Sequence, residues 1–233
     1  MKRQTKQTPH SKRFNEIKTK VDKTKVYPLA EAIKLAKETA TTKFDSSIEI
    51  AVKTGIDTGK SEQQVRATVL LPHGTGKKIK IAVIAPPDKQ KEAKAAGADI
   101  IGGEELIEQI AKTQKISFDI LVTIPEMMKD LAKIAKILGP KGLMPSPKTD
   151  TVSPNLKKTI EELAKGKISF KNDDTGNIHI IIGKASFPDD KLSENYQTFL
   201  EALNKCKPAG IKGIFIKNIT ISSTMGPGIR VQI

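Results

Sequence analysis

The residues of this chain that could carry out chemistry are few and scattered. Its three histidines, His10, His73 and His179, lie far apart in the sequence from one another and from the single cysteine, Cys206. Metal-ligating His and Cys residues usually recur at short spacings, and neither an His-Glu-x-x-His nor a Gly-x-Ser-x-Gly motif is present. The carboxylates are spread among lysines without a closely spaced pair in apolar sequence. The sequence therefore predicts a protein with no catalytic residues, no metal and no cofactor.

The segment Gly74-Thr75-Gly76-Lys77 invites comparison with a phosphate-binding loop. A P-loop has four residues between its glycines and continues as Lys-Ser/Thr at the start of a helix, so that backbone amides cradle the phosphate. Here only Thr75 separates the glycines, and the apolar pattern that follows is that of a strand. A basic turn is the favoured interpretation. A nucleotide-dependent enzyme is the alternative, which calorimetry with common nucleotides would test.

Two other segments suit contacts with RNA. Phe44 stands between Lys43 and Asp45 before an alternating strand, where an aromatic residue usually belongs to the core. Residues 222–228, SSTMGPG, predict a hairpin tip with small hydroxyl residues and an exposed methionine, Met225. Hydroxyl groups and open backbone suit hydrogen bonds to ribose and phosphate. An ordinary tight turn explains the glycines equally well, so both interpretations stay open.

The net charge indicates a polyanionic partner. The 233 residues include 40 Lys and Arg against 26 Asp and Glu, a net charge of +14. Residues 1–25 carry +7, residues 26–67 carry zero, residues 68–159 carry +5 and residues 160–233 carry +2. We predict that the first segment is a flexible basic arm that contacts phosphates without reading sequence, with a solvated charged terminus as the alternative. The absence of a long apolar run or an apolar signal region predicts a soluble intracellular protein with no membrane span.

The elements that must position these residues fall into two patterns. The outer segments predict helices packed on one face of an antiparallel sheet, whereas the middle segment alternates strands and helices buried on both sides, which is typical of a mostly parallel sheet. One long helix is predicted to begin at Pro125. A slip in the alternation at Lys217-Asn218 predicts a β-bulge. The strands predicted in the outer segments cover residues 48–52, 167–171, 177–182, 214–221 and 229–233, with a turn over 172–176 joining the second to the third.

Six sequence blocks carry a resemblance to a known family. They are ETATTKFDSSIEI, KSEQQVRATVLLPHGTGK, AGADIIGGEELIEQI, ILGPKGLMPSPKTDTV, NDDTGNIHIIIGKASF and SSTMGPG. In this order they closely resemble the bacterial large-subunit ribosomal stalk protein family, large ribosomal subunit protein one. The resemblance runs from about Val21 to the C-terminus.

The resemblance implies an α+β fold of two domains after the basic N-terminal arm of residues 1–25. A split β-α-β sheet domain, built from both chain ends, is expected over residues 26–67 and 160–233. An inserted Rossmann-like α/β domain is expected over residues 68–159. This division agrees with the change of pattern in the middle of the sequence.

The resemblance also implies a function without enzymatic activity. Members of the family bind the stalk region of 23S ribosomal RNA near the exit site of the large ribosomal subunit, and assist movement and release of deacylated tRNA. They also repress translation of their own-operon mRNA. We therefore expect a cytoplasmic, ribosome-associated RNA-binding protein that is a monomer when free.

The residues that match the family's RNA contacts are named by their positions here. The expected RNA-binding residues are Lys43, Phe44, Asn172, Asp173, Thr224, Met225 and Gly226. An auxiliary RNA-binding surface is expected at Lys141, Gly142 and Met144. In this interpretation Lys43 contacts phosphate, Phe44 and Met225 pack on the RNA surface, and the residues on either side of Met225 bond to ribose or backbone atoms.

Overall fold

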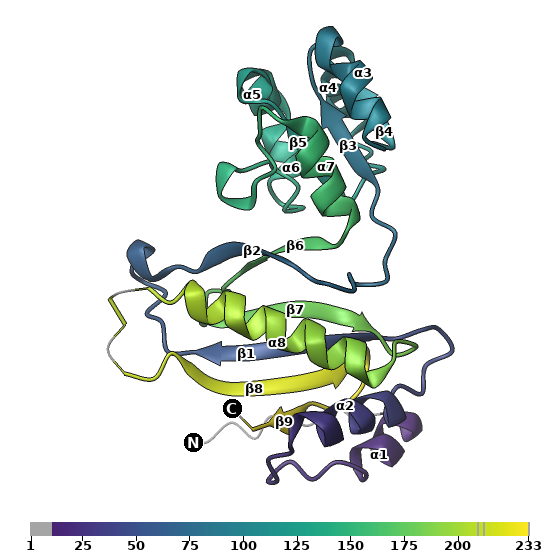
Figure 1. Ribbon diagram of the computed structural model, residues 1–233, viewed down its shortest axis with the longest axis vertical. Coiled ribbons are helices and arrows are strands. Elements are labelled where there is room, and N and C mark those ends of the chain that lie inside the picture. Colours follow the sequence, from purple (N-terminus) through teal and green to yellow (C-terminus); the bar gives the residue numbers. More distant parts are fainter. Residues whose placement is uncertain (1–10, 209, 212, 233) are drawn as a thin grey trace, which may run out of the picture. The chain divides into compact units, whose positions relative to one another are not determined.

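Helices and strands alternate irregularly along the chain, and the strands form three separate sheets. The computed structural model describes residues 11–208, 210, 211 and 213–232 (Figure 1). Backbone proximity divides the chain into two units. Unit 1 comprises Met1–Gln64, Lys171–Leu200 and Lys207–Ile233, and unit 2 comprises Val65–Phe170 and Glu201–Cys206.

The sheet of unit 1 has four antiparallel strands in the order β7-β1-β8-β9. Its register pairs Lys53 with Asn218 but Thr54 with Ile216, so Lys217 is the extra residue of a β-bulge. The bulge predicted from the slip in alternation is thus confirmed. The strands are β1 (Ser47–Thr54), β7 (Asn177–Lys184), β8 (Ile216–Ser223) and β9 (Ile229–Val231).

Helices α2 (Leu29–Glu38) and α8 (Asp189–Lys205) cover one face of this sheet (Figure 1). Side chains on that face are buried at every second position, which is the pattern that a strand with one covered face produces. Gly183 leaves room for the helix, because a Cβ there would lie 2.7 Å from Cδ2 of Leu192. The apolar alternation in the sequence predicts this arrangement of helices on one face. A short 3₁₀ turn, η1 (Ser61–Gln63), follows β1.

Residues 11–25 differ from the flexible arm that the sequence predicts. Helix α1 (Lys12–Lys18) occupies part of this segment, and Ile17 and Val21 are buried in unit 1. The many lysines of the segment conceal its short apolar period, and two buried side chains are enough to fix about two turns of helix against a larger core. Residues 1–10, the rest of the predicted arm, lie outside the described residues.

Unit 2 contains a parallel three-stranded sheet in the order β4-β3-β5. All four residues of its central strand are buried, because Ile81 and Val83 face one apolar cluster and Ala82 and Ile84 face another. This confirms the parallel pairing and two-sided burial predicted for the middle segment. The elements are β3 (Ile81–Ile84), α3 (Pro87–Ala95), β4 (Ile100–Gly102), α4 (Glu104–Thr113), β5 (Ile120–Thr123), η4 (Pro147–Thr149) and α7 (Leu156–Ala164).

The long helix predicted from Pro125 is replaced by four short pieces. Buried Leu131, Ile134 and Leu138 recur at spacings of three and four residues, and 3₁₀ turns place residues three apart on the same side. The apolar period alone does not distinguish this arrangement from a regular helix. The pieces are η2 (Pro125–Met127), α5 (Met128–Leu131), η3 (Ala132–Ile134) and α6 (Ala135–Leu138).

Strands β2 (Arg66–Leu70) and β6 (Lys167–Lys171) pair in a sheet of their own. The two strands predicted at residues 167–171 and 177–182 and the turn between them are confirmed, but the strands do not pair with each other as a hairpin. The turn between them makes only an isolated bridge, Asn172 to Ile178, after which β7 joins β1 in the unit 1 sheet.

Candidate nucleic-acid interface

Phe44 and Met225 are large apolar side chains exposed at the same end of the unit 1 sheet, with 53% and 65% of their surface accessible. The segment before Phe44 is rich in hydroxyl side chains that bond to its backbone. Thr39 Oγ1 donates to Ala36 O at 3.0 Å, and Thr42 Oγ1 donates to Phe44 O at 2.9 Å. Because half of the Phe44 side chain is exposed, the alternative that it is a core residue is wrong.

The backbone after Phe44 is fixed by the turn that follows β7. The Asp45 carboxylate accepts hydrogen bonds from Ser186 N at 3.2 Å and from Ser186 Oγ at 2.8 Å. Lys184 Nζ donates to Asp45 O at 3.3 Å and to Ser47 Oγ at 3.1 Å. The aromatic ring therefore extends into solvent from a backbone that is bonded on both sides.

Thr224 joins the end of β8 to the start of β1. Its backbone N donates to Ser47 O at 2.9 Å, and its Oγ1 donates to the same oxygen at 3.2 Å and accepts from Ser47 N at 3.1 Å. A hydroxyl group has one proton to donate, and that proton is used here within the protein. In this arrangement Thr224 can only accept a further hydrogen bond, and its principal effect is to position the residues beside it.

Met225 and Gly226 form the outermost turn of the tip. Met225 has φ +61°, in the left-handed region that few non-glycine residues adopt. Gly226 N donates to Ser223 O at 2.8 Å, and a Cβ on Gly226 would lie 2.2 Å from Ser223 Oγ. Since Ser223 is buried and its hydroxyl lies 3.4 Å from Thr39 Oγ1, no room exists for a side chain at position 226.

Ser47 links the two segments, because it follows the Phe44 segment in the chain and its backbone N and O are hydrogen-bonded to Thr224. We call the resulting surface the tip surface, and it consists of the exposed Lys43 and Phe44 with Thr224, Met225 and Gly226. Five of the seven residues predicted to bind RNA are thus brought together at one end of the sheet. Exposed apolar side chains suit packing on sugar or base faces, and an exposed lysine suits phosphate.

The two other predicted residues, Asn172 and Asp173, lie at the opposite end of β1, about 20 Å of extended chain away. The Asp173 carboxylate accepts from Asn177 N at 2.6 Å, from Thr175 N at 2.9 Å and from both of their side chains. These hydrogen bonds, that from the Asn177 backbone first, hold the pKa of Asp173 well below its ordinary value. The carboxylate is committed to its own turn, and Asn172 Nδ2 donates to Asp173 O at 3.0 Å.

Between the two ends, the sheet face opposite to the helices carries mainly polar side chains. Lys53 and His179 are exposed on this face, whereas most of the others are half-buried. Because these positions alternate with the buried ones, the face is continuous from the tip surface to the Asp173 turn. Glu49, Ala51 and Lys53 of β1 lie opposite Ser222, Thr220 and Asn218 of β8 and opposite Ile181, His179 and Asn177 of β7.

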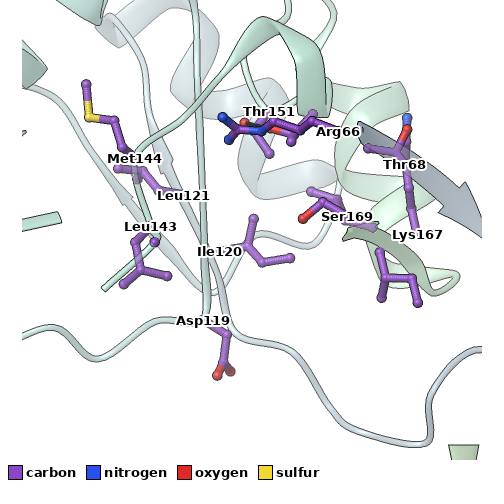
Figure 2. A pocket seen from close by; sticks show the side chains of 14 residues that line it. Arg66, Thr68, Asp119, Ile120, Leu121, Leu143, Met144, Thr151, Lys167 and Ser169 are labelled. Carbon is purple, nitrogen blue, oxygen red and sulfur yellow. Dashed lines mark hydrogen bonds between the residues drawn. The ribbon is translucent and has the colours of Figure 1, made fainter. Parts of the chain in front are cut away.

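The predicted auxiliary residues belong to unit 2, in the loop between α6 and η4. Lys141 and Gly142 are exposed, and Gly142 has φ +69°. Gly142 and Met144 line a pocket of about 130 Å³. Figure 2 shows Leu143 and Met144 at this pocket, with side chains of β2 and β6 at another side: Arg66, Thr68, Lys167 and Ser169.

Lys167 in this pocket is already neutralised by acidic neighbours. Its Nζ donates to Asp150 Oδ2 at 2.7 Å and to Glu162 Oε2 at 2.8 Å. Burial opposes the charge, but these two hydrogen bonds outweigh it and raise the pKa of Lys167. The ammonium group therefore serves to hold the 139–155 loop to β6 and is not available to a phosphate.

The Gly74–Lys77 segment lacks the structural context of a phosphate-binding loop. Gly74 and Gly76 have φ +60° and +72°, and the chain continues without a helix into β3. Lys77 Nζ is bonded to Asp119 Oδ1 at 2.7 Å. Over the described residues, no group of three His, Cys, Asp or Glu side chains is placed to hold a metal ion, and no helix is long and apolar enough to cross a membrane.

Arg13 lies beside the tip surface, and sequence reasoning does not identify it. The hydrogen bonds made by Ser47, Lys184 and Ser186 are likewise not indicated by the sequence. Arg13 was counted as part of a basic arm, although its helix is signalled by Phe14, Ile17 and Val21 at helical spacing. Nothing in a single sequence indicates the partners of its guanidinium, which are far away along the chain.

Comparisons with known proteins agree on one family. The model of the ribosomal protein L1p/L10e family matches residues 36–227. The large ribosomal subunit protein uL1 of Thermosipho africanus is 51% identical over 223 residues, covering 96% of each chain. Its counterpart in Mesoplasma florum is 55% identical over 223 residues, covering 96% of this chain and 98% of the relative. The one in Mycoplasma capricolum is 53% identical over 222 residues, covering 95% and 98%.

The family match covers the Phe44 segment, the Asp173 turn and the Thr224–Gly226 tip, so the residues that form the candidate interface fall within it. The relatives share about half of their residues with this chain over nearly its whole length. By these criteria this chain belongs to the ribosomal protein L1p/L10e family.

Proposed function

We propose that this chain binds the stalk region of 23S ribosomal RNA near the exit site, with the tip surface as its main contact. The observation that carries the proposal is the exposure of Phe44 and Met225 on backbone segments that are each fixed by hydrogen bonds, the first through Asp45 and the second through Thr224 to Ser47. Exposed apolar side chains on a fixed frame favour recognition of a preformed surface. Folded RNA offers such a surface through its ribose and base faces.

The charge distribution supports a division of work in this binding. The segments 26–67 and 160–233 carry only +2 together, although they contain the tip surface. Most of the excess positive charge lies in residues 1–25 and 68–159. Long-range attraction to RNA is therefore provided mainly by those segments, and discrimination between RNAs by the tip surface.

Family membership makes the chain a structural, non-enzymatic ribosomal protein, cytoplasmic and ribosome-associated. Its relatives bear the name large ribosomal subunit protein uL1, so we assign this chain to the large subunit. We extend the proposal to movement and release of deacylated tRNA at the exit site, and to repression of the own-operon mRNA. The resemblance to the family supports both roles, and the mRNA would compete with ribosomal RNA for the tip surface.

The proposed domain organisation follows the same resemblance. A split β-α-β sheet domain over residues 26–67 and 160–233 would hold the tip surface, and a Rossmann-like α/β domain over 68–159 would be inserted in it. The antiparallel sheet of unit 1 and the parallel sheet of unit 2 support this assignment. Lys141, Gly142 and Met144 of the inserted domain would add the weaker, auxiliary RNA contact.

Binding of the full chain to a stalk fragment of 23S ribosomal RNA tests the proposal directly. A gel-shift titration at two salt concentrations should show saturable binding to this fragment and much weaker binding to an unrelated RNA duplex of equal length. Equal affinity for both RNAs would leave only non-specific attraction and would contradict the proposal. Addition of the leader of the own-operon mRNA should displace the fragment.

A further inference from the structure

A single arginine of α1 joins the two halves of the tip surface. Arg13 Nη1 donates to Thr41 Oγ1 at 3.1 Å, and Arg13 Nη2 donates to Met225 O at 3.2 Å. These partners lie 28 and 212 residues away in the sequence. One planar guanidinium thus connects the segment that precedes Phe44 with the residue at the centre of the tip.

The helix that carries Arg13 is itself fixed in unit 1. The hydroxyl of Ser11 caps it by accepting a hydrogen bond from Phe14 N at 3.3 Å. Ile17 and Val21 are only 3% and 6% exposed. Packing therefore sets the position of the helix, and the hydrogen bond to Met225 is made from a residue whose backbone is supported.

The backbone of Met225 needs such support. Its φ of +61° is unfavourable for a residue with a side chain, and a turn of this kind persists when its surroundings hold it. Thr224 is bonded to Ser47 on one side of it and Gly226 N to Ser223 O on the other. Arg13 binds the carbonyl oxygen of Met225 itself.

We propose that Arg13 is a positioning residue for RNA binding, whose two inward hydrogen bonds set the place of Met225 relative to the Phe44 segment. This inference rests on the proposed function of the tip surface. A lysine at position 13 would have the charge but not the fork of two fixed donors, so charge and geometry can be separated. Lys12, exposed on the same helix, provides the matched control.

The first experiment measures the affinity of the full chain for the 23S stalk fragment at several salt concentrations, for wild type, Arg13→Gln, Arg13→Lys and Lys12→Gln. We expect Arg13→Gln to weaken binding about tenfold, with the slope of log affinity against log salt unchanged, and Arg13→Lys to restore only part of the loss. Lys12→Gln should change affinity by less than about twofold. A slope that falls by about one in Arg13→Gln, with full rescue by lysine, would make Arg13 a phosphate contact and overturn the proposal.

A second experiment asks whether Arg13 acts through Met225. If it does, Arg13→Gln should cost little more in a Met225→Ala chain than Met225→Ala costs alone. If the double variant loses affinity by the product of the two single-variant losses, the proposal is overturned. Thermal unfolding of each variant shows whether the fold is retained.

Hydrogen exchange of the free protein separates this inference from the proposed function. The amide of Gly226 should exchange at least about fivefold faster in Arg13→Gln than in wild type, whereas Lys12→Gln should leave it unchanged. Failure of the wild-type chain to bind the stalk fragment would contradict the proposed function alone. Unchanged exchange in both Arg13 variants would contradict the positioning role alone.

Discussion

The two ends of β1 are both rich in polar residues, but they use them in opposite ways. At the start of the strand, Ser47, Thr224 and Asp45 bond to backbone groups and leave Phe44 and Met225 exposed. At the other end, the polar groups around Asp173 are directed at that carboxylate, which has four hydrogen bonds within its own turn. The first end is built to present side chains and the second to complete a turn. Polar composition alone therefore does not identify a binding surface.

The largest loss of RNA affinity is expected at the start of β1, when the exposed apolar side chains of Phe44 and Met225 are removed. The double variant Phe44→Ala, Met225→Asp should weaken binding to the stalk fragment by about 2–4 kcal/mol, because it deletes one packing surface and places a negative charge on the other. Ile214, 75% exposed in the segment before β8, offers a control in Ile214→Ala, which should bind as wild type. Undiminished binding by the double variant would contradict the assignment of the tip surface.

Loss of the Thr224 hydroxyl should have a smaller effect at the same end. Thr224→Val keeps the shape of the side chain but removes its two side-chain hydrogen bonds to Ser47, and we expect binding to weaken by about 1–2 kcal/mol. Thr224→Ser keeps the hydroxyl and should restore most of the affinity. Full binding by Thr224→Val with a loss in Thr224→Ser, measured by the same titration, would mean that the methyl group and not the hydroxyl matters.

Two truncations of the N-terminus should separate the effect of its positive charge on RNA affinity from the positioning effect of Arg13. Removing residues 1–10 takes away Lys2, Arg3 and Lys6, which should lower the salt slope by at most about three and leave the preference for the stalk fragment within about twofold. Removing residues 1–20 also deletes Arg13 and should reduce that preference. If both truncations have the same effect on preference, α1 plays no part in recognition.

The smallest effect on RNA binding is expected at the Asp173 end. Asp173→Asn should change affinity at neutral pH by less than about twofold, because the carboxylate is committed to its own turn.

The pKa of Asp173 in the folded chain lies below the ordinary 3.8, so the stability that this carboxylate contributes is complete above about pH 4 and is lost as the pH falls toward the depressed value. Thermal unfolding from pH 5 to pH 2 should show a steeper decline for wild type than for the variant. A loss of RNA affinity as large as that of Thr224→Val would make this end part of the interface.

Features set by local pattern could be predicted from the sequence. The bulge at Lys217 and the parallel β4-β3-β5 sheet follow from alternation and from continuous apolar runs, which depend on neighbouring residues alone. The segments that hold Phe44 and Met225 were identified through their resemblance to a family. Their own residue types left the alternatives of a core aromatic residue for Phe44 and of an ordinary tight turn for the Met225 segment.

Features set by distant partners could not be predicted. Whether Phe44 is exposed depends on Ser186, more than 140 residues away, and the partner of β6 is β2 rather than its neighbour in sequence. The position of Arg13 depends on a carbonyl group at residue 225. Such contacts form only when the whole unit folds, so they cannot be predicted from the spacing of residues along the sequence.

The backbone of both halves of the tip surface is fixed, one through the hydrogen bonds of Asp45 and the other through those of Thr224 to Ser47, and this has a thermodynamic consequence. A surface whose backbone is already fixed has little conformational entropy left to lose when a ligand covers it. The heat-capacity change on association should then reflect the apolar area that is covered, without the larger contribution of coupled folding. The protein side of such a complex is ready before the encounter, so the association rate would be set by charge and by the RNA.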